Sequence, residues 1–472
     1  MTIVTTTAGQ VRGASSDGAL VFRGIPYARA ERYRTPEPPA PWEGVRDALE
    51  FGPIAPQAGG AQFQRADLVQ DEDCLSLNVW TPALDGEPRP VMVWIHGGAF
   101  RQGSGASPLY DGARLAAEGV VVISVNYRLG PLGFVAHPDL GGGNWGLHDQ
   151  IESLRWIRDN AAAFGGDPTN VTIFGESAGA VSVWLLCASP LAEGLFQRAI
   201  AQSGAPMATT LKAASRTAER MVELLGVDNV AALRDVPVAD LLAVQAQVDA
   251  GRMEAFVPCV DGAVLESKPS DGLTGVPMIV GTNVDEWKLW APMDPHSRDL
   301  DDAHLLRRVQ ERMGDAAGDV IAAVRAIRAD RGEPSAPNDV WFAIETERFF
   351  RVPALLGADA QLAVQPETYV YLFGWSSPAM GGWLGACHGL EIAFVFGNQG
   401  RGELAAFTGS GPEADALSEA MMGAWLAFAR TGDPGWPRYE TTGRPTMVFD
   451  RECRTESAPR DEERATLQRA MG

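Results

Sequence analysis

A serine flanked by glycines is the feature that most constrains the fold of this chain. Gly175-Glu-Ser-Ala-Gly179 directly follows the apolar run Val171-Thr-Ile-Phe174, and the apolar segment 181–187 comes after it. The order of strand, sharp turn and helix is that of a nucleophile elbow, in which a strained turn presents the central serine and the flanking positions favour glycine. Ser177 is therefore the candidate nucleophile, and a purely structural turn is the alternative.

A serine hydroxyl is a weak nucleophile at neutral pH, so it needs a base, an orienting acid and donors for the oxyanion. The run 91–95 is typical of a buried strand and leads into His96-Gly-Gly-Ala-Phe100, a glycine loop of the type that supplies oxyanion donors. We expect the N–H groups of Gly98, Ala99 and Ala178 to bind the oxyanion. The alternative is a tight turn at the sheet edge.

The expected chain order in this type of site is serine, acid, histidine. The run 276–281 is typical of a buried strand, and Thr282-Asn-Val-Asp-Glu286 follows its end, where catalytic residues of open α/β sheets gather. Of six histidines, His388 is the best placed, because it lies between glycines just before an apolar run. Order alone leaves Asp285 and Glu286 open as the acid, and leaves a structural role open for His388.

With these motifs the chain resembles the type-B carboxylesterases of the α/β-hydrolase fold, a family that includes cholinesterases and bacterial p-nitrobenzyl esterases. The resemblance covers nearly the whole chain. Its matching segments are 22–28, 72–80, the His96 loop, 144–150, 164–168, the elbow, 202–204, 281–286, 387–397 and 428–434.

The resemblance implies roles for individual residues. Ser177 would be the nucleophile, His388 the general base and then acid, and Glu286 the carboxylate that orients the imidazole, with Asp285 as its neighbouring rival. No cofactor or metal is implied, and the substrate would be a small ester.

The resemblance also implies two structural ion pairs, Arg23 with Glu72 and Arg128 with Asp167. Two departures from the family pattern stand out. The cysteine matching Cys74 is disulfide-bonded in secreted relatives, but no cysteine precedes it here. Animal relatives often have glycine after the acid, whereas this chain has Trp287, which predicts a bulkier wall.

Composition limits the compartment and the partners. Five cysteines without regular spacing predict reduced thiols, and Cys387 is expected to pack rather than to act as a nucleophile. The N-terminus lacks the basic and long apolar stretches of a signal peptide, and no apolar run is long enough to span a membrane, so we expect a cytoplasmic protein. A formal charge of −21 argues against nucleic-acid partners. The oligomeric state stays open.

We predict an α/β-hydrolase fold with a central, mostly parallel twisted sheet, flanking helices and an N-terminal hairpin, forming one domain over 1–472. Helical cap insertions are expected near 205–255 and 290–340. The expected strands are 120–126, 198–202, 369–373 and 446–449, and the longer helices are 148–163 and 341–363.

The predicted activity is hydrolysis of carboxylic esters through an acyl-enzyme. Carbamates or aryl amides on the same triad are the alternative, and a non-catalytic binding module is the third reading. Phe100, Trp375 and Trp383 could line an apolar pocket, although plain core is the alternative. Because the base must be neutral, activity should fall as the pH drops toward about 6.

Overall fold

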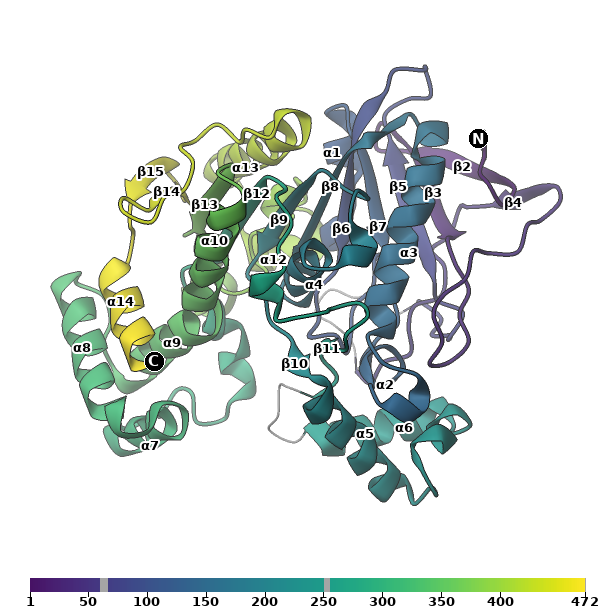
Figure 1. Cartoon of the computed structure of the whole chain (residues 1–472). Coiled ribbons are helices and arrows are strands. Elements are labelled where there is room, and N and C mark those ends of the chain that lie inside the picture. Colours follow the sequence, from purple (N-terminus) through teal and green to yellow (C-terminus); the bar gives the residue numbers. More distant parts are fainter. Residues whose placement is uncertain (60–66, 250–254, 472) are drawn as a thin grey trace.

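The computed structural model describes residues 1–59, 67–249 and 255–471, and a long twisted sheet runs through it (Figure 1). The strand order is β1-β2-β3-β5-β7-β6-β8-β9-β12-β13-β14-β15, with β4 beside β2. Their bounds are β1 Thr2–Thr5, β2 Gln10–Ser16, β3 Ala19–Pro26, β4 Val45–Asp47, β5 Ser76–Thr81, β6 Arg89–Ile95, β7 Val121–Val125, β8 Gly166–Glu176, β9 Arg198–Gln202, β12 Met278–Asn283, β13 Thr368–Phe373, β14 Pro445–Phe449 and β15 Arg454–Ser457. Two short strands, β10 (Thr209–Thr210) and β11 (Cys259–Val260), pair separately.

The central strands from β7 through β6, β8, β9, β12 and β13 to β14 are all parallel. Every residue of β7 and β13 is buried, which explains why these strands read as continuous apolar runs in the sequence. Antiparallel strands complete both ends, and β1 with β2 forms the N-terminal hairpin. The expected mostly parallel sheet is confirmed. Its parallel strands end at one edge, where the predicted site residues follow them.

Helices cover both faces of the sheet (Figure 1). One face is covered by α3 (Trp145–Asn160), α4 (Ala178–Cys187) and α10 (Val352–Val364), and α2 (Gly130–Phe134) packs against α3. The other is covered by α1 (Ala113–Ala117), α11 (Ile392–Val395) and α13 (Pro412–Thr431). Each face has its own apolar core. The helix expected over 341–363 consists of α9 (Pro337–Thr346), the π-helix η9 (Glu347–Arg351) and α10.

Both expected helical excursions are present. The first contains α5 (Leu211–Leu225) and α6 (Val238–Asp249), and its predicted end at 250–254 lies outside the described residues. The second contains α7 (Asp302–Met313) and α8 (Ala317–Asp330), which pack with α9 and α14 (Asp461–Ala470) around a third core (Figure 1). The remaining short helices are η1 Pro108–Tyr110, η2 Pro138–Leu140, η3 Ala161–Phe164, η4 Pro190–Ala192, η5 Val230–Arg234, η6 Pro269–Asp271, η7 Glu286–Met293, η8 Gly314–Ala316, η10 Ala379–Gly382, η11 Gly402–Leu404 and α12 Ala405–Thr408.

The ion pair expected between Arg23 and Glu72 is wrong. Glu72 instead receives two hydrogen bonds from Arg32, at 2.9 Å from Nε and 2.6 Å from Nη2. Arg23 donates to Leu49 O at 3.3 Å. The fork of Arg32 matches the two carboxylate oxygens, which makes the bidentate pair the stronger one.

The pair expected between Arg128 and Asp167 is also wrong. Arg128 is buried and binds Asp149 of α3 through Nε (2.8 Å) and Nη2 (2.6 Å). A buried guanidinium needs a buried counter-charge, and the Asp149 side chain is 0% exposed. Asp167 instead caps its own turn by accepting from Thr169 N.

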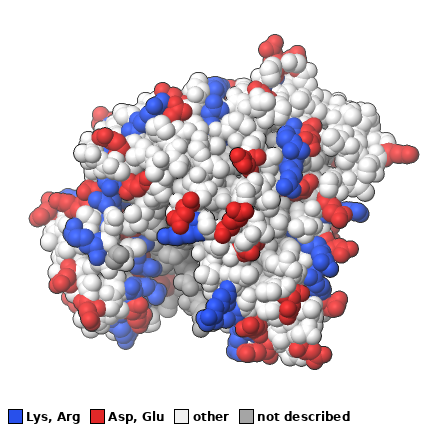
Figure 2. All heavy atoms as spheres, in the orientation of Figure 1, with Lys and Arg blue, Asp and Glu red and all other residues white. Residues whose placement is uncertain are grey.

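Acidic and basic side chains are interspersed over the face shown in Figure 2.

All five cysteines are free, and four of them are buried. Burial raises the pKa of the Cys387 thiol, which fits the expectation that it packs. None of the helices in the described part of the chain is long and apolar enough to cross a membrane. Within 1–59, 67–249 and 255–471, His, Cys, Asp and Glu side chains form no cluster that could hold a metal ion.

Candidate active site

Ser177 stands at the sharp turn between β8 and α4. Its φ of 58° and ψ of −122° are strained for a residue with a side chain. Its N–H donates to Gln202 O and its carbonyl accepts from Val181 N, both at 2.9 Å. A Cβ at Gly179 would lie only 2.0 Å from Ile95 O, so this position requires glycine. The structure therefore contains the predicted order of strand, turn and helix, with Ser177 at its apex.

His388 and Glu286 meet beyond the ends of the neighbouring strands β12 and β13. His388 Nδ1 lies 2.7 Å from Glu286 Oε2, and the other carboxylate oxygen accepts from Asn283 N at 2.7 Å. Glu286 is fully buried and His388 is buried. A carboxylate can only accept, so Nδ1 carries the proton. The second ring nitrogen, Nε2, is thereby left for the nucleophile.

Asp285, the rival for the acid, lies in a different environment. Its Oδ1 pairs with Lys288 Nζ at 2.8 Å, and its Oδ2 accepts from Ala386 N at 3.0 Å. Ala386 belongs to the loop that carries His388. The structure thus brings Glu286 against the imidazole, while Asp285 binds the backbone of the histidine loop.

Glu176, the residue before the candidate nucleophile, contacts the other side of the imidazole. Its Oε1 lies 2.9 Å from His388 Nε2, but the angles at the two atoms are not those of a hydrogen bond. Ser177 makes no side-chain hydrogen bond to His388 among the described residues. The sequence analysis missed this role of Glu176, although an acidic residue inside the elbow motif was the available signal.

These two carboxylates set the charge of the imidazole. Burial by itself lowers the pKa of His388, but the negative charges of Glu176 and Glu286 outweigh it and raise that pKa well above 6.5. The two carboxylates thus favour the protonated form of this imidazole more than water does for a free histidine.

A third glutamate completes the buried cluster. Glu391 accepts hydrogen bonds from Asn283 Nδ2 (2.6 Å) and Gln202 Nε2 (3.1 Å), and Gln202 in turn accepts from Trp425 Nε1. Burial, together with the carboxylates on either side of His388, raises the pKa of Glu391 to about 8. The hydrogen bonds of Glu391 tie the ends of the strands together.

The predicted oxyanion loop lies directly against the elbow. A Cβ at Gly97 would lie 2.7 Å from Glu176 O and 3.1 Å from Ser177 Cβ. After it come three residues with positive φ: Gly98 (110°), Ala99 (55°) and Phe100 (61°). Backbone with positive φ can turn successive N–H groups toward an anion.

Ala178, the third predicted donor, is the first residue of α4. The first N–H groups of a helix lack partners inside the helix, and the helix dipole favours negative charge there. Gly97 of the loop thus lies against the elbow, and Ala178 begins α4 directly after Ser177.

An aromatic wall lies beside the imidazole. The ring centroid of Phe350, from η9, is 4.7 Å from that of His388, and that of Trp290 is 5.0 Å away. Phe349 and Trp287 extend this cluster. Phe350 is buried, whereas the other three aromatic residues are partly exposed, so they offer an apolar surface next to the base.

None of the three aromatic residues predicted for the pocket belongs to this aromatic wall. Phe100 is part of the predicted oxyanion loop and packs against Phe134. Trp375 is buried against Phe394 and donates to a backbone carbonyl. Trp383 packs on the side of the third core, beneath Arg298. Neither tryptophan makes a ring contact with His388 in the described part of the chain.

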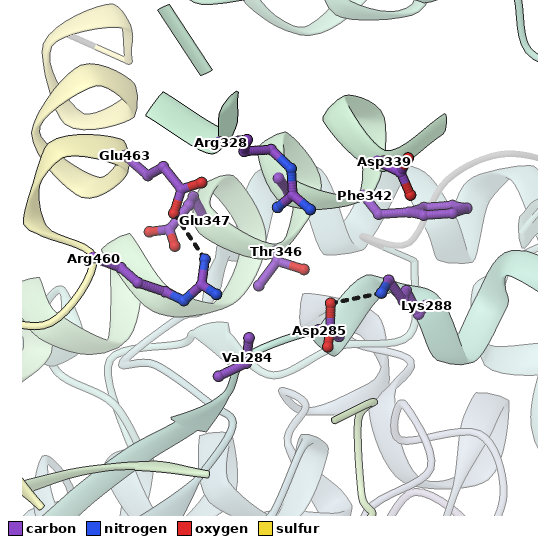
Figure 3. A pocket seen from close by; sticks show the side chains of 11 residues that line it. Val284, Asp285, Lys288, Arg328, Asp339, Phe342, Thr346, Glu347, Arg460 and Glu463 are labelled. Carbon is purple, nitrogen blue, oxygen red and sulfur yellow. Dashed lines mark hydrogen bonds and ion pairs between the residues drawn. The ribbon is translucent and has the colours of Figure 1, made fainter. Parts of the chain in front are cut away.

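A cluster of charged side chains surrounds a small cavity next to Asp285 and Lys288, in the segment that also carries Glu286 (Figure 3). Arg460 donates to Glu463 at 3.1 Å, and Glu347 pairs with Arg351 at 3.0 Å, with both partners nearly fully buried. Burial raises the pKa of Glu347 to about 7, against the effect of Arg351. The first pair lies at the start of α14 and the second within η9, and the two helices contact each other beside the cavity.

The carboxylesterase family model matches residues 1–466 of this chain. Among characterised proteins, the chain is 37% identical to the para-nitrobenzyl esterase of Bacillus subtilis (strain 168), with 98% of each chain covered. It is 38% identical to the phenmedipham hydrolase of Pseudarthrobacter oxydans, with 94% of each covered.

The solved structures give the same result. A carboxylesterase from Geobacillus stearothermophilus superposes with a TM-score of 0.88 at 38% identity, covering 99% of this chain and all of the other. A para-nitrobenzyl esterase structure superposes with a TM-score of 0.86 at 36% identity, covering 98% of this chain. The chain therefore belongs to the carboxylesterase family and has its α/β-hydrolase fold, which makes it a hydrolase of carboxylic ester bonds.

Proposed function

We propose that Ser177, His388 and Glu286 act as the catalytic triad of this esterase. The observation that carries the proposal is the 2.7 Å hydrogen bond between His388 and the fully buried Glu286, beside a serine held in strained backbone. In the active form, His388 is neutral with its proton on Nδ1. Its Nε2 then carries a lone pair. The Glu176 carboxylate repels this lone pair, whereas the Ser177 hydroxyl can donate a hydrogen bond to it.

In the first half of the reaction, Ser177 Oγ attacks the ester carbon and passes its proton to His388 Nε2. The oxyanion that forms is stabilised by the N–H groups of Gly98, Ala99 and Ala178. His388 then gives the proton to the departing alcohol, which leaves an acyl-enzyme. In the second half, water attacks the acyl group and passes a proton to His388 Nε2. His388 then returns that proton to Ser177 Oγ, which releases the acid. The imidazolium of each step lies between two carboxylates, which favour it electrostatically.

Uncharged esters with apolar groups fit the site, because partly exposed aromatic rings stand beside the base. The two relatives at 37% and 38% identity are named for para-nitrobenzyl esters and phenmedipham, so these compounds are suitable probes. We further propose that the chain acts as one catalytic domain in the cytoplasm, supported by its five free cysteines.

The test compares wild-type protein with Ser177→Ala on p-nitrophenyl acetate, butyrate and octanoate, with circular dichroism to show that both are folded. We expect the variant to lose at least about 10³-fold in kcat. A fluorophosphonate should add one covalent label to the wild type and none to the variant. Equal rates in two folded proteins would contradict the assignment of the nucleophile.

A further inference from the structure

His96 is a buried histidine that the reaction proposed above does not use. It directly follows β6, and only 1% of its surface is exposed. Its ring stacks on that of Tyr127, with centroids 4.4 Å apart and planes inclined by 19°. The imidazole therefore has a fixed orientation.

The hydrogen bond of this ring shows which tautomer is present. His96 Nδ1 lies 2.8 Å from the carbonyl oxygen of the next residue, Gly97. Burial lowers the pKa of His96 to about 4, so the ring is neutral near pH 7. A carbonyl only accepts, so the single ring proton is on Nδ1 and is donated to Gly97 O.

This bond fixes the direction of the neighbouring N–H group. A trans peptide group is planar, and its C=O and N–H point to opposite sides. Holding Gly97 O against the imidazole therefore turns the N–H of Gly98 to the other side of the loop. The Tyr127 hydroxyl holds the preceding peptide in the same way, because it donates to His96 O at 2.7 Å.

The next peptide is held by backbone hydrogen bonds among the described residues. Gly98 O accepts from Arg101 N (3.0 Å) and Gln102 N (3.1 Å), which fixes the direction of the Ala99 N–H. Of the loop's two candidate oxyanion donors, Gly98 is thus the one whose direction depends on a side chain within the described part of the chain.

We propose that His96 is a positioning residue of the oxyanion hole: its Nδ1–H bond to Gly97 O directs the Gly98 N–H toward the oxyanion, and the Tyr127 hydroxyl supports the same peptide chain. This proposal rests on the function proposed for the Ser177 site. It concerns only the direction of a donor, so its effect is expected in the transition state rather than in substrate binding.

Two amide substitutions separate the role of Nδ1 from the presence of a polar side chain. In His96→Asn the amide nitrogen takes roughly the place of Nδ1, whereas in His96→Gln it takes roughly that of Nε2. We expect His96→Gln to lose about 10- to 100-fold in kcat, the range for a misplaced catalytic group, with KM within about threefold. His96→Asn should stay within about fivefold of wild type. His148→Asn, at a partly buried histidine of α3 that stacks on Trp145, is the matched control and should behave as wild type.

The proteins are compared on p-nitrophenyl butyrate, with melting temperatures measured for each. Equal loss in folded His96→Asn and His96→Gln, or a loss that lies in KM alone, would overturn the proposal. If His96→Gln does not fold, Tyr127→Phe decides, because it keeps the stacked ring. A folded Tyr127→Phe with lowered kcat and unchanged KM supports the proposal, and wild-type kcat overturns it. Failure of the proposed function would differ, since Ser177→Ala would then retain activity.

Discussion

Glu176 Oε1 and His388 Nε2 lie 2.9 Å apart, so the candidate base has a carboxylate on each of its two ring nitrogens. The hydrogen bond to Glu286 forms with the neutral imidazole as well as with the protonated one, because Nδ1 carries a proton in both. The contact with Glu176 is favourable only when Nε2 is protonated. Glu176 therefore stabilises the form of His388 that cannot accept the serine proton.

This arrangement predicts the pH dependence of activity. The pKa of His388 is raised, so the active neutral form accumulates only as the pH rises through that value, and the acidic limb of kcat/KM should lie above 6.5 rather than near 6. Glu176→Gln removes one negative charge, lowers the pKa of His388 and should move the limb to lower pH. Profiles of kcat/KM against pH test this. A limb that stays in place, or moves up, would contradict the role given to Glu176.

The two neighbouring acidic residues should differ strongly on substitution. Glu286→Gln removes the carboxylate that holds Nδ1–H and should lower kcat/KM by roughly 10³- to 10⁴-fold. Asp285→Asn keeps an acceptor for Ala386 N and should cost less than about tenfold. Kinetics on p-nitrophenyl butyrate, with melting curves for both variants, measure this. If Asp285→Asn is the more damaging at equal stability, the assignment of the acid is reversed.

Trp290 should limit the size of the group bound beside the base. Its ring is partly exposed and 5.0 Å from that of His388, so Trp290→Ala opens space there. We expect the ratio of kcat/KM for octanoate over acetate to rise on the order of tenfold. Trp383→Ala, which removes a ring that does not contact His388 in the described residues, is the control and should leave the ratio unchanged. The same rise in both variants would exclude a specific role for Trp290.

The buried pair Glu347–Arg351 should matter for stability. Both side chains are at most 4% exposed, so Arg351→Met leaves a carboxylate buried without its partner, which costs about 3–5 kcal/mol of unfolding free energy. Arg451→Met breaks an exposed pair with Glu413 and should cost little. Urea unfolding compares the two variants. Equal effects would show that the Glu347–Arg351 pair does not contribute to stability.

The sheet could be predicted, and the triad residues could be proposed, because their signals are local. Buried parallel strands appear as apolar runs; Ser177 and Glu286 follow such runs, His388 precedes one, and the three occur in a known order. The choice between Asp285 and Glu286 could not be made from order, because adjacent residues differ only in which way the turn directs them. The structure separates them through Lys288, which pairs with Asp285.

The aromatic wall and the ion pairs could not be predicted for a different reason. Whether a ring meets His388 depends on the turns of η7 and η9, which leave no periodic pattern in the sequence. Trp375 is near His388 in sequence but packs into the core, whereas Phe350 is distant in sequence and touches the imidazole. Likewise, Arg128 pairs with Asp149 because helix α3 brings that carboxylate to a buried guanidinium.

The number of residues in the π-helix Glu347–Arg351 determines which side chains face the candidate active site. A π-turn contains one residue more than the α-helical turn it replaces. Deleting a single residue here would let α9 and α10 join as one regular helix, with α9 rotated by about 100° relative to α10. Trp341 could then no longer face the third core while Phe350 faces His388. Substitutions along this segment change one contact each, but an insertion or deletion would shift the register of all of them at once.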